Sequence, residues 1–397
     1  MLDELLERHQ VPGAQLVIRH GGETTVSATG VTRLGSGDPV TDRSAFPLGS
    51  ITKPVTAMLV MALVEDGELE LDASLADHLG PAHRDRTVRQ LLSHTAGLPA
   101  TLREQDEALS RARWAARLDE APFPPGGQFS YSNAGYVLAG HLAEVITGMS
   151  WTDAVSAIVL EPLGITPAPA AVAGHSVHNG SKTVVLDGAP GPAIEDPAGG
   201  LALSAAELAV LTTGAGRMCE DQLTGIAVGP FGMADGWGLG WARYGTWWGH
   251  DGTGDGTSAH VRFDPGTGDA VVLTTNASTG PLLWQAALER LAAQGISVGD
   301  HPFSTLPGAG DPVPPPAGAT GRYVNGDLVL DVTTTPAGDL ALALGGRPYA
   351  GLTCYTGDRF LARELTSARM TYAGRFITGA DDAVTHVQIS GRLSRKQ

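Results

Sequence analysis

The sequence has few cysteines, no strongly basic segment and no long apolar run. Its only cysteines, Cys219 and Cys354, lie outside any Cys-x-x-Cys or metal-type cluster, so we expect two unpaired thiols. The formal net charge of −16 argues against a nucleic-acid partner, which would require a basic face. The chain lacks a run of about 18 apolar residues, so we expect no membrane span.

Signals for export and for cofactors are also missing. Residues 1–10 (MLDELLERHQ) have neither the basic start nor the apolar stretch of a signal peptide, so we expect a cytoplasmic protein. The histidines show no HExxH-like spacing, and there is neither a phosphate loop nor a dinucleotide fingerprint. We therefore expect no metal and no cofactor.

The patterns that are present alternate between strands and helices. Residues 14–20 and 23–29 are β-rich and flank Gly21-Gly22, which predicts a hairpin. Segments with strand patterns return near residue 236. The predicted helices cover 51–66, 87–93, 104–118, 134–147 and 281–294, and the later strands cover 237–241, 245–250, 257–263 and 270–276. This order predicts an α+β fold, in which strands from both ends share one antiparallel sheet and the helices between them form a separate block.

A composition change divides the chain. Residues 301–318 hold six prolines and several glycines, which predicts a stiff linker. Beyond it, residues 319–397 alternate short strands with turns and predict a small all-β domain. We therefore expect a catalytic domain at 1–300, a linker at 301–318 and a small β-barrel-like domain at 319–397.

The first candidate for chemistry is Ser50-Ile-Thr-Lys53, at the start of an apolar helix. Positions i and i+3 share a helix face, so the hydroxyl and the amine are neighbours. A serine needs an adjacent base to be nucleophilic, and a lysine can serve if burial and the helix dipole lower its pKa. Taken alone, the pattern also fits Ser50 as a helix N-cap and Lys53 as a solvated side chain.

Two further segments carry polar groups that suit the same chemistry. In Tyr131-Ser-Asn133, a phenol near an ammonium can act as a phenolate base, and the amide can hold a substrate amide. In His250-Asp-Gly252-Thr253, glycine permits close approach of a ligand, and the histidine can orient a proton or a carboxylate. Each segment alone also fits a purely structural role.

Together, these three motifs resemble, in order and spacing, those of the serine β-lactamase and penicillin-binding-protein family. That family includes class C β-lactamases, D-Ala-D-Ala carboxypeptidases and related esterases and D-aminopeptidases. The surrounding segments 46–53, 87–98, 162–165 and 197–201 look like further landmarks of the family. The resemblance covers about residues 1–295, and it implies a β-lactamase/transpeptidase-like fold. The C-terminal β unit looks like the lipocalin-like domains that follow some members.

The resemblance also implies roles for individual residues. Ser50 looks like the acylated nucleophile, Lys53 like its proton partner and Tyr131 like the base that activates Ser50. Asn133 resembles the holder of the substrate amide. His250 and Gly252 belong to the third motif, and the N–H groups of Ser50 and Thr253 are the implied oxyanion hole. His94 and Thr95 lie in a family landmark, and for them we expect structural roles.

The third motif departs from that of true lactamases, which have Lys-Ser/Thr-Gly. Here Asp251 replaces the hydroxyl residue and adds a negative charge where a carboxylate would bind. Two like charges at 4–5 Å cost about 1–4 kcal/mol, depending on the dielectric. We therefore expect weak or no β-lactamase activity.

The resulting prediction is a serine hydrolase that forms an acyl-Ser50 intermediate from a small-molecule or peptide-like ester or amide. One alternative is an acyltransferase that passes the acyl group to an amine in natural-product biosynthesis. The tryptophans at 237, 241, 247 and 248 would then form an apolar acceptor wall, although they also fit simple core packing. Another alternative is a binding module with a dead site. The sequence leaves the oligomeric state open, a homo-oligomer included.

Overall fold

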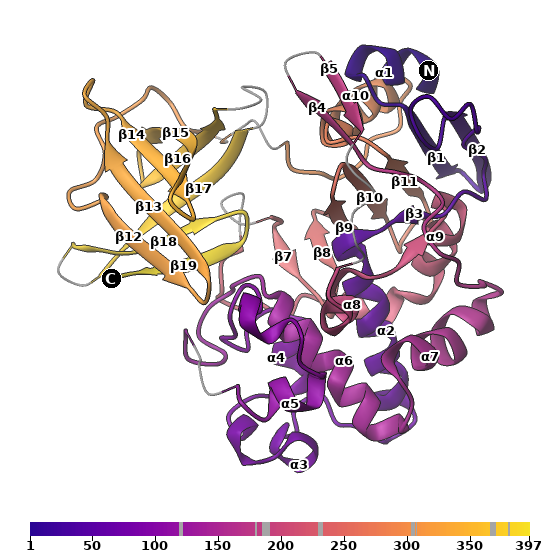
Figure 1. The fold of residues 1–397 in the computed structure, drawn as a ribbon, viewed down its shortest axis with the longest axis horizontal. Helices are drawn as coiled ribbons and strands as arrows, with labels where there is room; N and C mark the ends of the chain where they lie inside the picture. Colours follow the sequence, from indigo (N-terminus) through magenta and orange to yellow (C-terminus); the bar gives the residue numbers. More distant parts are fainter. Residues whose placement is uncertain are drawn as a thin grey trace.

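A computed structural model describes residues 1–118, 122–178, 181–184, 191–228, 233–302, 306, 308–365, 371–379 and 382–397. These residues form a mixed α/β part and a separate C-terminal barrel (Figure 1). The fold class predicted from the sequence, an α+β catalytic part followed by a small all-β domain, is confirmed.

The central element is a seven-stranded antiparallel sheet in the order β2-β1-β11-β10-β9-β8-β7. Its N-terminal hairpin pairs through β1 with β11, so Ala14 lies opposite Thr275, and the two ends of this part share one sheet as predicted. The strands are β1 (Gly13–His20), β2 (Glu23–Gly30), β7 (Gly236–Trp237), β8 (Ala242–Tyr244), β9 (Trp247–Gly254), β10 (Thr257–Phe263) and β11 (Ala270–Thr275).

Helices cover both faces of this sheet. On one face, α1 (Leu2–His9) and α10 (Gly280–Ala293) share an apolar cluster with β1 and β11. On the other face lies the helical block, in which α2 (Thr52–Glu65) packs against α6 (Asn133–Thr147) and α8 (Asp196–Gly199). Because α2 is buried on several sides, its sequence is apolar nearly throughout.

Short elements complete the helical block. The additional helices are α3 (Ala76–Leu79), α4 (Val88–Leu92), α5 (Arg111–Ala115), α7 (Trp151–Ala154) and α9 (Ala205–Leu211). The additional strand pairs are β3 (Phe46–Pro47) with β6 (Ala202–Leu203), and β4 (His175–His178) with β5 (Ser181–Val184). The brevity of the two strand pairs explains why the sequence pattern did not reveal them.

The helix predicted over 104–118 is wrong in extent. The segment has a 3₁₀ turn at Glu104–Asp106, and α5 starts only after Ser110. The Ser110 side chain accepts a hydrogen bond from the Arg113 N–H, which caps α5 and separates it from the turn.

The C-terminal barrel is closed and antiparallel, with its strands in sequence order. Inward-facing residues such as Tyr323, Leu330 and Phe360 form its own core. The strands are β12 (Gly321–Asn325), β13 (Leu328–Thr334), β14 (Leu340–Leu344), β15 (Arg347–Tyr355), β16 (Arg359–Glu364), β17 (Thr371–Thr378), β18 (Val384–Ile389) and β19 (Arg392–Lys396).

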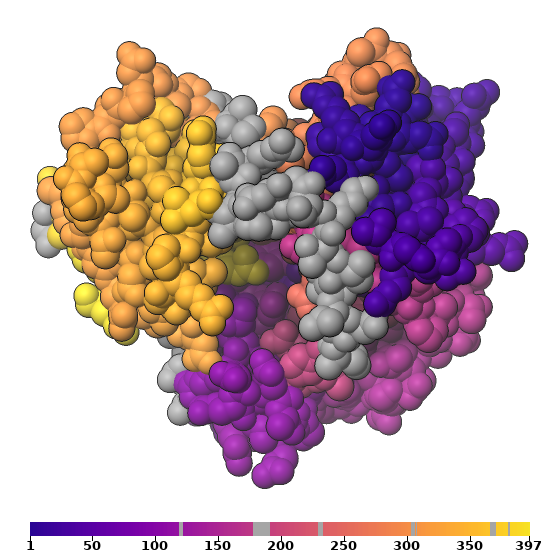
Figure 2. Space-filling model, turned by 45° about the horizontal axis from the view of Figure 1, so that its top comes forward, coloured from indigo at the N-terminus to yellow at the C-terminus, as the bar shows by residue number. Residues whose placement is uncertain are grey.

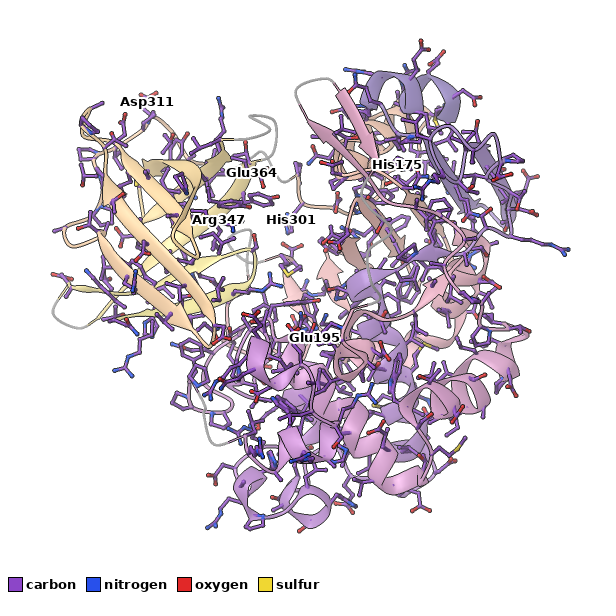
Figure 3. The ribbon with its side chains drawn as sticks, in the orientation of Figure 1. His175, Glu195, His301, Asp311, Arg347 and Glu364 are labelled. Carbon is purple, nitrogen blue, oxygen red and sulfur yellow. The ribbon has the colours of Figure 1, made fainter. Side chains whose placement is uncertain are left out.

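A hollow separates the barrel from the N-terminal strands, and residues of the helical block form its floor (Figure 2). The described residues between 301 and 318 form neither helix nor strand and lead from the sheet to the barrel. His301 lies in the gap between the two parts (Figure 3). The division at 300 and 318 stays a prediction.

Among the described residues, every helix is too short or too polar to traverse a bilayer. Both cysteines are free thiols. The described part of the chain also holds no cluster of three or more His, Cys, Asp or Glu side chains arranged to bind a metal ion.

Candidate active site

Ser50 and Lys53 lie together where a 3₁₀ turn (Gly49–Ile51) continues into α2. The Lys53 Nζ lies 3.0 Å from the Ser50 Oγ and donates to the Ala198 carbonyl oxygen at 2.7 Å. No part of Lys53 reaches solvent. Burial holds the pKa of Lys53 well below its ordinary value, nearby Arg392 acts in the same direction, and Glu195 opposes both. A neutral amine next to a hydroxyl can accept its proton.

Tyr131 completes this trio. The Lys53 Nζ lies 5.0 Å from the centre of the Tyr131 ring, which is 1% exposed. Burial raises the pKa of the phenol, and the nearby Ser50 hydroxyl acts in the opposite direction. The low dielectric therefore favours a neutral phenol over the phenolate expected from the sequence. Ser50 and Tyr131 line one cavity, and the buried Lys53 lies against both, so the three side chains come together as the motif spacing predicts.

Asn133 is the first residue of α6, two positions after Tyr131. The N-cap is Ser132, whose hydroxyl accepts from the Gly135 N–H at 2.9 Å, so Asn133 is not needed as a cap. The Asn133 N–H donates to the Ala100 carbonyl, whereas its buried Oδ1 has no partner within the described ranges. A buried unpaired amide oxygen is costly, so this atom is available for a ligand donor.

Close backbone contacts bring the nucleophile turn against β9. A Cβ on Gly252 would lie 1.9 Å from the Leu48 carbonyl oxygen, and one on Gly49 would lie 2.4 Å from that of Thr253. Gly49 also has φ +50, a left-handed conformation that favours glycine. Ser50 and Thr253 line the same cavity. The oxyanion hole implied for their two N–H groups stays a prediction.

His250 lies beneath this cavity, with its ring 6.0 Å from that of Tyr131 and 5.6 Å from that of Trp237. Its Nδ1 lies 2.7 Å from the Asp251 carbonyl oxygen, and its Nε2 is buried without a partner among the described residues. Burial, assisted by Lys53, lowers the pKa of His250 to about 3. His250 is therefore neutral at physiological pH and does not replace the cationic lysine of the lactamase motif.

Asp251 keeps the negative charge expected from the sequence, but that charge is held in an ion pair with Arg262. Its carboxylate accepts from Arg262 at 2.9 and 3.0 Å and lies 2.8 Å from the His260 Nδ1. Arg262 also binds Asp300 at 2.5 Å. Although burial acts against the charge, Arg262 is the largest of the effects that lower the pKa of Asp251. Two basic side chains thus compensate this carboxylate.

The four tryptophans belong to the core. All are at most 8% exposed, and none lines the cavity at Ser50. Core packing is therefore the correct interpretation, and an acceptor wall made of tryptophan is wrong.

The cavity at Ser50 has a volume of about 210 Å³ and receives residues from both parts of the chain. Its barrel side includes Arg392, whose guanidinium carbon lies 5.1 Å from the centre of the Tyr131 ring. The lining residues are Ser50, Tyr131, Met233, Tyr244, Asp251, Thr253, His260, Arg262, Pro281, His301, Pro302, Tyr372, Ala373, Ser390 and Arg392. Sequence reasoning missed the barrel residues, because no local pattern links them to the motifs.

His94 and Thr95 have structural surroundings, as expected. The His94 Nδ1 accepts from the Ser132 N–H at 3.0 Å, and its ring stacks 4.3 Å from that of Tyr131. The Thr95 hydroxyl lies 3.0 Å from that of Ser93. His94 thereby helps to hold the loop that carries Tyr131.

Comparison with known proteins agrees with this geometry. The family model described as Beta-lactamase matches residues 1–295. The chain belongs to the Beta-lactamase family. This family consists of serine hydrolases and acyl-transferring enzymes, so this chain is an enzyme of that broad class.

Relatives of this Beta-lactamase-family chain include penicillin-binding protein 4 of Amycolatopsis lactamdurans, which is 32% identical over 317 residues. That match covers 69% of this chain and 83% of the relative. Esterase EstB of Burkholderia gladioli is 35% identical over 193 residues, 41% of this chain and 47% of the relative.

One solved structure matches the Beta-lactamase-family part and the barrel together. The crystal structure of SurE is 36% identical, with a TM-score of 0.85, and the match covers 100% of this chain and 97% of SurE. SurE has also been solved with D-Leu, and that structure has a TM-score of 0.82 to this chain. The two-part architecture is therefore shared with a known protein.

Proposed function

We propose that this protein is a serine acyl hydrolase that forms an acyl-Ser50 intermediate from an ester or amide substrate. The observation that carries the proposal is the 3.0 Å contact between the Ser50 Oγ and the buried Lys53 Nζ, beside the Tyr131 ring. A nucleophile with a base of lowered pKa and a phenol beside it are the parts that acyl transfer requires.

Acylation begins when the Ser50 Oγ attacks the substrate carbonyl carbon. Its proton passes to the neutral Lys53 amine, and the new C–O bond gives a tetrahedral oxyanion that faces the N–H groups of Ser50 and Thr253. When the bond to the leaving group breaks, the departing alcohol or amine takes a proton from the Lys53–Tyr131 pair. In this scheme the Asn133 Oδ1, which is buried without a partner among the described residues, accepts from a substrate N–H.

Deacylation repeats these proton movements with a new nucleophile. A water molecule gives its proton to Lys53 as its oxygen attacks the ester carbon. The Ser50 Oγ then leaves and regains a proton, which releases the acid. The lowered pKa of Lys53 and the raised pKa of Tyr131 support the choice of the Lys53 amine as the base and of the neutral Tyr131 phenol as the proton relay.

The relatives narrow the substrate class. One is a penicillin-binding protein, and a solved relative that matches the full chain, SurE, has a crystal structure with D-Leu. We therefore propose that the enzyme acts on substrates with a D-amino-acid residue at the reacting position. The neutral His250 and the absent motif hydroxyl leave a β-lactam carboxylate without its usual partners at the third motif, which supports weak or no β-lactamase activity.

Transfer to an amine is a second candidate. It is favoured because the cavity extends beyond Ser50 to the barrel and because D-Leu, the compound in the second SurE structure, carries an amino group that could accept the acyl group. A bound amine would then replace water in the second step, and the product would be an amide.

The test is intact-mass spectrometry after exposure to a p-nitrophenyl ester, D- and L-configured aminoacyl esters and nitrocefin. We expect an acyl adduct on the Ser50 peptide, faster reaction with the D ester, and no adduct with Ser50→Ala. Ser110→Ala, which alters only the cap of α5, is the matched control. Added D-Leu should yield an amide product if transfer operates. A folded wild-type chain that no probe labels would support the binding-module alternative.

A further inference from the structure

A single buried amide joins the barrel to the loops of the active site. Asn325, at the end of β12, is 1% exposed. Its Nδ2 donates to the Leu393 carbonyl at 2.6 Å and to the Ser130 Oγ at 3.3 Å. Its Oδ1 accepts from the Ala100 N–H at 3.0 Å. One side chain thus connects two barrel strands to the residue before Tyr131 and to a second loop.

The second loop leads back to the site. The Ala100 carbonyl accepts from the Asn133 N–H at 2.9 Å, so both ends of the segment 130–133 are linked to Asn325. Ser130 also accepts from the Leu393 N–H at 3.3 Å and is itself 3% exposed. Buried hydrogen bonds of this kind hold geometry, because breaking one leaves an unpaired polar group.

The turn between β18 and β19 makes a further contact with Tyr131. The Tyr131 N–H donates to the Gly391 carbonyl at 2.8 Å. Gly391 has φ +74, and a Cβ there would lie 2.8 Å from the Met233 Sδ and 3.4 Å from the Tyr131 Cβ. The turn can approach this closely because the residue is glycine.

These contacts converge on the segment that carries the phenol. On its other side, the Ser132 N–H is held by the His94 Nδ1. Each residue from 130 to 133 therefore has a hydrogen bond to a residue outside the segment, and three of the four are tied to the barrel, Asn133 through Ala100. A displacement of 1 Å in a reacting group can reduce a rate about 100-fold.

We propose that the C-terminal barrel is a positioning element of the catalytic site, in which Asn325 and the β18–β19 turn fix Tyr131 beside Ser50. This proposal rests on the proposed function, because it treats Tyr131 as a catalytic group. Asn325 itself acts through Ser130 and Ala100 and is a positioning residue.

The test compares Asn325→Ala, Ser130→Ala and the double variant in the full-length chain. With a p-nitrophenyl ester, we expect Asn325→Ala to lower kcat at least about 10-fold and to change KM less than about twofold, because positioning affects the reacting state more than binding. The double variant should lose less activity than the product of the two single losses, because both substitutions remove the Asn325–Ser130 hydrogen bond.

Tyr323→Phe is the matched control. The Tyr323 hydroxyl donates to the Ala319 carbonyl at 2.6 Å within the barrel, so its loss also removes a buried hydrogen bond. We expect this variant to lower the Tm without changing kcat. If Asn325→Ala fails to fold, Ser130→Ala alone carries the test, since it removes only one hydroxyl.

Two results would overturn the proposal. If the Asn325→Ala and Ser130→Ala variants fold and keep the wild-type kcat, the positioning role of the barrel is wrong. Labelling of Ser50 in the wild-type chain would in that case still support the proposed function. A kcat loss in Tyr323→Phe as large as that in Asn325→Ala would show general destabilisation instead. A wild-type chain that is never acylated would overturn the proposed function and, with it, this inference.

Discussion

The side-chain nitrogen of Lys53 lies 3.0 Å from the hydroxyl oxygen of Ser50 in a position closed to solvent. Replacing Lys53 with Met keeps the side-chain length but removes the base. We expect acylation to slow by about 10²–10⁴-fold, the usual contribution of a positioned base. Burst kinetics with a p-nitrophenyl ester measure this. Lys396→Met, at the end of β19, is the control and should react like wild type.

Removal of Arg392 should move the pH dependence of the reaction. After burial, this guanidinium is the largest influence that lowers the pKa of Lys53, whereas Glu195 raises it. Because kcat/KM rises as Lys53 loses its proton, Arg392→Gln should shift the rising limb of its pH profile to higher pH. Asp251, which affects the pKa of Tyr131, and His250, which affects the pKa of His94, both remain in the variant.

The control for that experiment is Arg322→Gln. Arg322 pairs with Asp331 on the outer surface of the barrel, so its removal should leave the limb in place. If the rising limb of the kcat/KM pH profile stays in place in Arg392→Gln, the prediction is contradicted.

His250 should make the folded state sensitive to acid. Its pKa of about 3 lies below the value near 6.5 of an unfolded chain, so the unfolded state binds more protons as the pH falls. Stability is therefore complete above about pH 6.5 and decreases towards pH 3. Between pH 6.5 and 4.5 this one group contributes a loss of about 2–3 kcal/mol.

Urea unfolding at several pH values measures that slope. His250→Gln should have a shallower dependence than wild type, whereas substitution of the exposed His78 should leave the slope unchanged. If the free energy of unfolding depends on pH to the same extent in wild type and in His250→Gln, this acid sensitivity does not come from His250.

Arg262 should be important for stability. Its removal leaves the carboxylates of Asp251 and Asp300 buried without their common partner. We expect Arg262→Met to lower the free energy of unfolding by about 3–5 kcal/mol. Arg243→Met, which breaks a half-exposed pair with Asp221, should cost at most about 1 kcal/mol. Equal losses in the two variants would refute this explanation.

The sequence was sufficient where function depends on local spacing. Ser50 and Lys53 meet because they are three residues apart at a helix start, and the shared sheet follows from the strand patterns at both ends of the catalytic part. The pairing of Asp251 with basic side chains could also have been predicted from the sequence. His260 is its direct partner in the β9–β10 pairing, so a correct register of that hairpin would have placed basic side chains beside it.

The contribution of the barrel could not be predicted in this way. Arg392 and Asn325 reach the site only through the docking of two folded parts, which no periodicity or turn signal encodes. The break before α5 was missed because the apolar pattern of 104–118 continues across Ser110, where the cap hydrogen bond decides the boundary.

The wall of the cavity formed by β17 and the β18–β19 turn has a consequence for refolding. Contacts between residues far apart in sequence require large loops to close and therefore form slowly. A chain diluted from denaturant should regain its helical circular-dichroism signal first and its reactivity towards an ester later, once the last strands have docked beside Tyr131.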